Sequence, residues 1–158
     1  MNRPTLCLIL ASACATASLA ATPHPFFEKK DDVHEIHLHF NHPNWFEKLT
    51  KDYGAGGGDD VPYTEASFEW RDVKMEKVGV RFKGFGSFMC TNGTKKPFRL
   101  KLNEFTKGQK IGGLGTYNLN NNCGDPSYVR ERPYYELGAS AGLLTPRHTY
   151  AALYINGK

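Results

Sequence analysis

Apolar and polar residues alternate with a period of two in four segments of the chain. The segments are VHEIHLHF, YTEASFEW, KVGVRFKG and KPFRLKLNEF, at residues 33–40, 63–70, 77–84 and 96–105. Such alternation is typical of strands that bury one face. A fifth strand is predicted over residues 148–156, HTYAALYIN, which ends at the turn-forming pair Asn156-Gly157. The pattern therefore predicts a domain built mainly around a sheet.

A first helix is predicted in the segment WFEKLTKDY, residues 45–53. Trp45, Phe46 and Leu49 lie on one stripe of such a helix, and Asn44 can cap its N-terminus. The segment that follows, GAGGGDD at residues 54–60, predicts a surface loop because glycine clusters interrupt regular structure.

A second helix is predicted over residues 126–141. Asp125 suits the N-cap, Pro126 suits the first helical position, and Gly142 suits the stop. Pro133 interrupts this segment, and a continuous helix would lose about 3 kcal/mol there. The sequence leaves open whether the helix is kinked or begins afresh at Pro133.

The order of these elements predicts an α+β fold, an antiparallel sheet with one or two packed helices. The chain has 158 residues, which suits one domain, and 40% of them are apolar, which suffices for a core. Its 16 glycines and 9 prolines indicate many turns and short elements rather than a helical bundle.

The first twenty residues read as a secretory signal peptide rather than as part of the fold. One basic residue, Arg3, precedes an uncharged apolar run, and small residues at Ser18 and Ala20 fit a cut near Ala20. A lipoprotein signal at Cys14 is disfavoured, because Ala11 replaces the large aliphatic residue usual in such signals. We therefore expect a signal peptide over 1–20, an irregular lead-in over 21–32 and the folded domain over 33–158.

The cut leaves two cysteines, Cys90 and Cys123, in an oxidising compartment. They form either a disulfide or two buried thiols, and they are too few for a zinc site. His37 and His39 share one strand face, but they lack a third ligand, so we expect no metal site. A net charge of +4 is mild, and we expect neither a nucleic-acid partner nor membrane association after cleavage.

Two of the predicted strands carry cations on the face opposite their apolar residues. Arg81 and Lys83 lie on one, and Arg99 and Lys101 lie on the other. If the strands are neighbours, the four cations share one surface, where like charges require solvent or an anion to screen them. The turn 84–87 ends in Ser87, and its glycines could expose backbone N–H groups to that anion. The alternative is an ordinary solvated surface, which is the usual place for Lys and Arg.

Five blocks follow one another along the chain: VGVRFKG, KKPFRLK, the pair YNLNNN and DPSYVRE, YELGASAGLLTPR and YAALYING. In this order they resemble the CotH kinase family, spore-coat-type proteins related to atypical protein kinases. With the N-terminal VHEIHLHFNHPNWFEKL, the likeness covers residues 33–158. It implies a fold similar to the N-terminal lobe of a protein kinase, with ATP and Mg as cofactors. The family usually has a polar Asn-Ser-Ser-like turn where this chain has Phe85-Gly86-Ser87.

The resemblance also implies roles for particular residues. Phosphates of the nucleotide would meet Arg81, Lys83, Ser87, Arg99 and Lys101. The sheet lysine that steadies them would be Lys101 first and Lys83 second. The helix acid that pairs with this lysine would be Glu131 or Glu136, since a lysine held by an acid is extended toward the phosphates. The sequence does not decide within either pair.

In the family, the aspartates that hold metal ions and orient the nucleophile lie downstream of the Tyr-Ile-Asn-Gly block, where this chain ends. We therefore expect a truncated N-terminal lobe without catalytic residues of its own, whose partners are a missing C-terminal lobe and a protein substrate. The alternative is a secreted cell-surface or glycan-binding module. Its sugar-stacking residues would be drawn from the aromatics Trp45, Tyr63, Trp70, Tyr117, Tyr128, Tyr134 and Tyr135.

Overall fold

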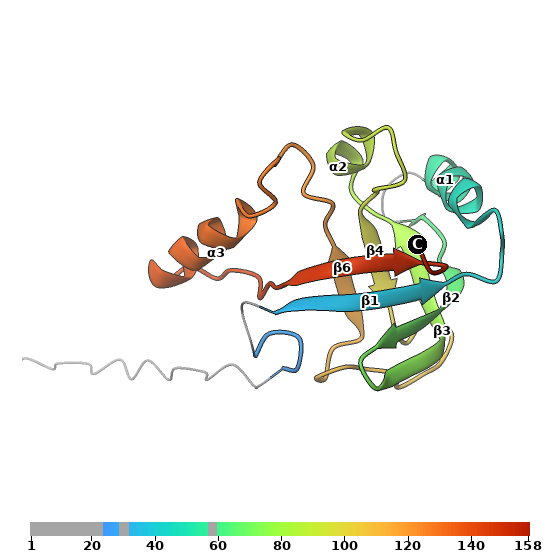
Figure 1. Ribbon diagram of the computed structural model, residues 1–158, viewed down its shortest axis with the longest axis horizontal. Helices are drawn as coiled ribbons and strands as arrows, with labels where there is room; N and C mark the ends of the chain where they lie inside the picture. Colours follow the sequence, from blue (N-terminus) through green and yellow to red (C-terminus); the bar gives the residue numbers. More distant parts are fainter. Residues whose placement is uncertain (1–23, 29–31, 57–59) are drawn as a thin grey trace, which may run out of the picture.

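The computed structural model of the chain describes residues 24–28, 32–56 and 60–158. The predicted signal peptide lies outside the described residues. The strands are β1 Val33–His39, β2 Thr64–Trp70, β3 Val73–Phe82, β4 Phe98–Lys101, β5 Thr116–Leu119 and β6 Tyr150–Ile155. The helices are α1 Trp45–Gly56, α2 Phe85–Met89 and α3 Glu131–Ser140. The α+β class predicted from the sequence is confirmed (Figure 1).

The strands form one sheet in the order β5-β4-β3-β2-β1-β6. All neighbours are antiparallel except β1 and β6, which run parallel and lie side by side in Figure 1. The prediction of an antiparallel sheet is therefore wrong at this pair. The long connection between β1 and β6 allows the chain to return in the same direction, and residue alternation within a strand does not encode that choice.

The apolar face of the sheet forms the core of the domain. Its buried residues, with those of the adjoining segments, include Ile36, Leu38, Phe40, Ala66, Phe68, Trp70, Val78, Val80, Phe82, Phe98, Leu100 and Leu102. Helix α1 packs on this face through Leu49, which is fully buried, while Trp45 and Phe46 are partly buried against the same core. The predicted strand faces and helix stripe are therefore confirmed. The helix continues to Gly56, however, into residues that the glycine cluster predicted as a loop.

Strand β5 did not emerge from the hydrophobic pattern. It has only four residues, of which Tyr117 and Leu119 are half-buried while Thr116 and Asn118 are exposed. Four residues are too few for alternation to distinguish a strand from a loop. Its pairing with β4 nevertheless places Asn118 directly opposite Arg99.

Helix α3 begins at Glu131, five residues later than the predicted start. Asp125 does not cap it; its carboxylate accepts hydrogen bonds from the Ser127 backbone N–H at 3.0 Å and the Arg130 N–H at 2.7 Å, which orders the preceding turn. Pro133 lies in the first turn, where backbone N–H groups have no intrahelical partner, so it breaks no hydrogen bond. A helix that starts just before Pro133 resembles the second alternative that the sequence left open.

The predicted stop of α3 at Gly142 is confirmed. Gly142 has a φ of 78°, its N–H bonds the Ala139 carbonyl at 3.0 Å, and the Leu143 N–H bonds the Gly138 carbonyl at 2.9 Å. These two bonds form a Schellman motif, which satisfies the last carbonyls of the helix. The helix itself buries no residue and projects from the sheet in Figure 1. Of the two predicted long helices, only α1 packs closely on the sheet.

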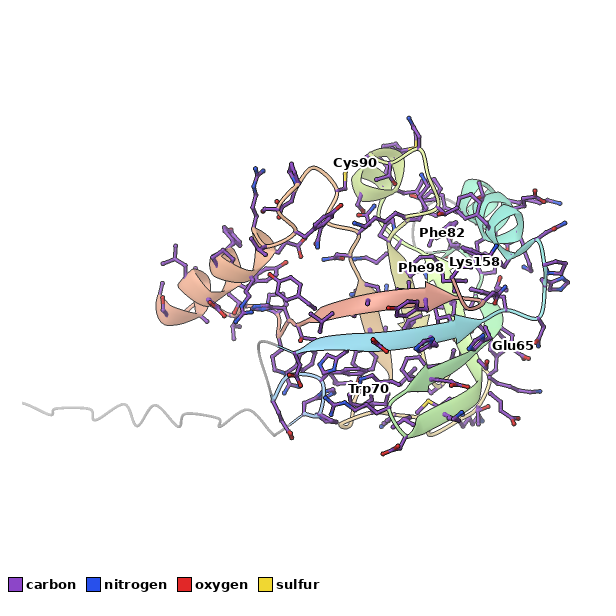
Figure 2. All side chains as sticks on the ribbon, viewed as in Figure 1. Glu65, Trp70, Phe82, Cys90, Phe98 and Lys158 are labelled. Atoms are coloured by element: carbon purple, nitrogen blue, oxygen red, sulfur yellow. A yellow bond between two sulfur atoms is a disulfide. The ribbon has the colours of Figure 1, made fainter. Side chains whose placement is uncertain are left out.

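The described part of the lead-in, residues 24–28, forms a turn that closes one end of the core. Phe26 is buried, with its ring centroid 4.0 Å from that of Trp70, which is labelled in Figure 2, and 5.1 Å from that of Tyr117. His24 lies 3.0 Å from the Ile111 carbonyl and 2.9 Å from the Tyr117 hydroxyl. The curled sheet is therefore filled between β2 and β5 by residues that precede the first strand. No helix in the described ranges has the length and apolar character needed to cross a membrane.

Candidate functional site

The four predicted cations lie on one face of the β3–β4 pair, opposite the core. Arg81 stands directly opposite Arg99, and Lys101 stands opposite Gly79. Lys83 follows the end of β3, where its backbone N–H bonds the Pro97 carbonyl at 3.1 Å. The prediction that two adjacent strands gather these side chains on a shared surface is therefore confirmed. We call this surface the cationic face, defined by Arg81, Lys83, Arg99 and Lys101.

The two arginines of the cationic face are held against the sheet rather than extended into solvent. Arg81 is only 4% exposed, and its guanidinium lies 5.2 Å from the centre of the Tyr63 ring. Arg99 is half-buried, and its Nε has no hydrogen-bond acceptor among the described residues. A buried donor without an acceptor is costly, so this arginine is held in place at the expense of one hydrogen bond. An ordinary solvated surface does not describe this pair.

Lys101 forms an ion pair with Glu104, in the turn after β4. Its Nζ lies 2.7 Å from Glu104 Oε2, and this hydrogen bond and charge raise the pKa of Lys101 above its ordinary value. Gly79 makes room for the contact, because a Cβ there would lie 2.7 Å from Glu104 Cβ and 3.0 Å from Tyr63 Cδ1. Lys101 is thus occupied by an acid that the sequence did not pair with it.

Lys83 is joined to helix α3 through an amide. Its Nζ donates to Asn120 Oδ1 at 2.7 Å, and Asn120 Nδ2 donates to Glu131 Oε2 at 3.0 Å. Burial lowers the pKa of Lys83; Glu131 raises this pKa and Arg99 lowers it. Glu136 instead lies 3.1 Å from Arg132 Nε within α3. The structure therefore brings Glu131, and not Glu136, toward a lysine of the cationic face.

The segment 84–87, predicted as a glycine-containing turn, enters a short helix. Gly84, with a φ of 66°, leads into the short helix α2, and a side chain at Gly84 would meet Ser87 Oγ at 2.7 Å. The Tyr53 hydroxyl donates to the Gly84 carbonyl at 2.8 Å. The chain therefore bends at Gly84, as the turn predicted there requires, and then forms the helical turn Phe85–Met89. A phosphate contact of Ser87 stays a prediction.

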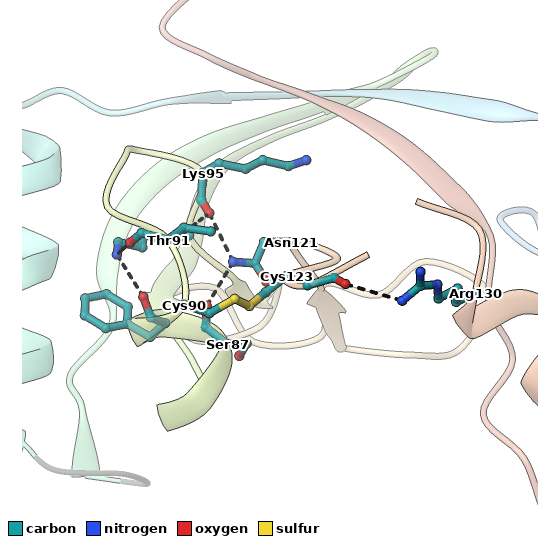
Figure 3. The surroundings of a disulfide bond; sticks show 10 residues. Ser87, Cys90, Thr91, Lys95, Asn121, Cys123 and Arg130 are labelled. Atoms are coloured by element: carbon teal, nitrogen blue, oxygen red, sulfur yellow. Dashed lines mark hydrogen bonds between the residues drawn. A yellow bond between two sulfur atoms is a disulfide. The ribbon is translucent and has the colours of Figure 1, made fainter. Parts of the chain in front are cut away.

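Helix α2 is fastened to the end of β5 by a disulfide and by one amide side chain (Figure 3). Cys90 and Cys123 are bonded, with their Cα atoms 6.1 Å apart, which is the first of the two alternatives for these cysteines. Asn121 is buried, and its Nδ2 donates to the Ser87 carbonyl at 2.9 Å and to the Lys95 carbonyl at 3.1 Å. Residues 87–95, which follow Lys83, are therefore attached to residues 121–123 by a covalent bond and by two hydrogen bonds.

Asn120, Asn121 and Glu104 are the residues of this site that the sequence did not single out. The run of three asparagines at 120–122 was the available signal, but it gave no partner for any of them. Their roles depend on the register of β4 and β5 and on the turn after β4. Neither follows from alternation along a single strand.

Residues that were candidates for other chemistry do not gather into sites. The described residues contain no group of three His, Cys, Asp or Glu side chains placed to hold a metal ion. His37 stacks on Tyr154, with ring centroids 4.8 Å apart, and its ring centroid lies 6.5 Å from that of His39. Among the aromatics considered for sugar stacking, Trp70 is buried and Tyr117 bonds His24.

Comparison with known proteins identifies the family of the chain. A family profile described as CotH kinase protein matches residues 80–158, the C-terminal half of the chain. This range contains α2, α3, strands β4 to β6 and all four residues of the cationic face. No curated protein and no solved structure matches the chain. The family match and the ordered sequence blocks lead to the same conclusion: the chain belongs to the CotH kinase family.

Proposed function

We propose that the cationic face binds the phosphates of a nucleotide, and that the chain is the N-terminal, phosphate-binding part of a secreted CotH-like protein kinase. The observation that carries this proposal is the pairing of Arg81 with Arg99 beside Lys83 on one face of two adjacent strands. Like charges so placed repel, and a polyanion over them relieves the repulsion.

Lys83 and Arg99 are the residues best placed to meet the phosphates. Lys101 is already matched by Glu104, and Arg81 is nearly covered. Lys83 uses one of its three ammonium donors on Asn120 and keeps two, and the half-buried Arg99 carries a guanidinium with five N–H donors. Arginine offers phosphate a planar fork and lysine offers a point charge, so the two are complementary.

The described residues fit the two implied cofactors unequally. The donors on the cationic face suit the phosphates of ATP, for the reasons just given. Mg²⁺ prefers carboxylate oxygens together with substrate phosphates, and the described residues assemble no such carboxylate group. We therefore propose nucleotide binding without phosphoryl transfer by these residues alone.

The kinase-like lobe, the secretion and the partners belong to the same proposal. The supports are the family match, the disulfide and the composition of residues 1–20. A C-terminal lobe would supply the metal-binding aspartates, and a protein would accept the phosphoryl group. A glycan-binding role has weaker support, because Lys95 covers the ring of Tyr128, with its Nζ 3.8 Å from the centroid, and Tyr63 lies beneath the cationic face.

Isothermal titration of the signal-cleaved chain with ATP and with inorganic tripolyphosphate tests the proposal. Lys83→Met and Arg99→Met should each weaken binding by at least about tenfold, since a hydrogen bond to a charged group contributes about 1.5–3 kcal/mol. Lys51→Met is the matched control, because Lys51 is exposed on α1 away from the site. Equal affinities for all four proteins, or binding of neither ligand, would refute the proposal.

A further inference from the structure

The amide of Asn120 lies between two groups of opposite charge, the Lys83 ammonium and the Glu131 carboxylate. It accepts from the Lys83 ammonium at 2.7 Å and donates to the Glu131 carboxylate at 3.0 Å. An ammonium only donates and an ionised carboxylate only accepts, so a carboxamide is a neutral side chain that satisfies both at once. The two contacts also fix which end of the amide faces Lys83.

We infer that Asn120 is a positioning residue, which holds the Lys83 ammonium beside Arg99 and thereby sets the affinity of the cationic face for phosphate. The affinity part of this inference rests on the proposed function, whereas the positioning part does not. A direct ion pair with Glu131 would spend the charge of Lys83 on a fixed carboxylate. The intervening amide orients the ammonium and leaves its charge and two donors for an incoming anion.

The backbone around Asn120 is well suited to hold a side chain in place. On one side, Leu119 pairs with Phe98 at the end of the β4–β5 ladder. On the other side, the buried Asn121 bonds the carbonyls of Ser87 and Lys95, and Cys123 is joined to Cys90. A residue fixed before and after itself loses little additional conformational freedom when its side chain makes a directed contact.

Lys83 needs such a guide because its surroundings are unfavourable to its charge. Burial and the Arg99 guanidinium both act against the ammonium, and Glu131 acts for it. Without the amide, the four-carbon side chain of Lys83 would be free to turn toward solvent or toward Glu131. Either movement would take it away from Arg99 and divide the cationic face.

Asn118, which lies in β5 two residues before Asn120, provides a matched control. It has the same side chain, lies on the same face two residues earlier, is exposed, and stands opposite Arg99. It makes none of the amide contacts described for Asn120. A general effect of removing an asparagine from this part of the chain would therefore appear in both variants, and a positioning effect would appear in Asn120→Ala alone.

The first readout needs no ligand. The ¹⁵Nζ ammonium signal of Lys83, assigned by its loss in Lys83→Arg, should be sharp in the wild type because the hydrogen bond slows solvent exchange. It should broaden beyond detection in Asn120→Ala and stay sharp in Asn118→Ala. A sharp signal in Asn120→Ala would overturn the positioning role, whatever the phosphate affinity of the protein.

The second readout is a double-mutant cycle on tripolyphosphate binding. Asn120→Ala and Glu131→Ala should each weaken binding by about fivefold, the usual net value of one hydrogen bond, and the double variant should be no weaker than either. Glu131→Gln should retain wild-type affinity, since its amide oxygen can still accept from Asn120. Additive effects, or wild-type affinity in Asn120→Ala, would overturn the inference, whereas a wild type that binds no tripolyphosphate would refute the proposed function alone.

Discussion

Alternate residues of β3 and β4 point to opposite faces of the sheet, and the two faces differ in chemistry. One face is apolar and buried, and the other carries the four cations. On the core face, Val78, Val80, Phe82, Phe98 and Leu100 are each at most 2% exposed. On the cationic face, two arginines oppose each other and two lysines flank them. The comparison shows that burial on one face can fix a register that sets like charges against each other on the other face.

The repulsion on the cationic face is moderated rather than absent. Glu104 forms an ion pair with Lys101, and the Tyr63 ring lies beside Arg81. Lys83 donates a hydrogen bond to Asn120, which in turn donates to Glu131. The core face needs no such partners because dispersion and burial are not directional. Substitutions on the two faces should therefore separate stability from ligand binding, which the following predictions test.

Removing a large side chain from the core face should have the greatest effect. Phe82→Ala should lower the free energy of unfolding by about 3–5 kcal/mol, because it leaves a cavity in a packed core. The Phe82 ring lies 5.1 Å from Phe98 and 5.3 Å from Phe88, measured between centroids, so helix α2 should loosen as well. Urea unfolding measures the loss. Lys83 follows Phe82 on the opposite face, and Lys83→Met should change the free energy of unfolding little. Equal losses in the two variants would contradict the difference between the two faces.

Removal of the disulfide should have the second-largest effect on stability. The bond closes a loop with a sequence separation of 33, and the chain-entropy relation assigns such a loop about 3–4 kcal/mol. The Cys90→Ser, Cys123→Ser double variant should unfold at correspondingly lower urea concentration. It should also bind tripolyphosphate more weakly, since the α2 segment and Asn121 lose their fastening. Loss of stability with unchanged binding would show that the cationic face does not depend on this clamp.

Tyr117 on the core side of β5 gives a pH-dependent test. Burial raises the pKa of Tyr117 to about 12. A raised folded-state pKa means that its contribution to stability is complete below pH 10 and is lost as the pH rises through about 12. Absorbance at the phenolate band should show a step near pH 12, and Tyr117→Phe should remove that step. Titration of every tyrosine at its ordinary pH would contradict the buried position of Tyr117.

The smallest expected effect is on the cationic face itself. Arg99→Met should raise the free energy of unfolding by about 0.5 kcal/mol, because it removes one of two directly opposed like charges. Arg71→Met is a suitable control, since Arg71 lies 3.4 Å from Asp32 and its loss removes an attraction instead. A marked loss of stability in Arg99→Met, seen by thermal unfolding, would mean that this arginine serves the fold rather than a ligand.

Much of the sheet was predictable because alternation identifies buried faces directly. The strands carrying Ile36, Phe68, Val80 and Leu100 and the cations opposite them followed from that period alone. The parallel return of β6, the short strand β5 and the partners of Lys83 and Lys101 did not. They depend on pairing between distant segments, and on local turn chemistry such as that of Asp125, which moved the start of α3 past Pro126.

The most direct test of the central claim is an NMR titration of the folded chain with tripolyphosphate, observed through arginine Nε and lysine Nζ signals. Binding at the cationic face predicts saturable shifts at Arg99 Nε and Lys83 Nζ, with smaller shifts at Lys101 and none at Lys48 or Lys51 on α1. Shifts that grow evenly over all surface lysines without saturation, or that concentrate away from β3 and β4, would contradict it.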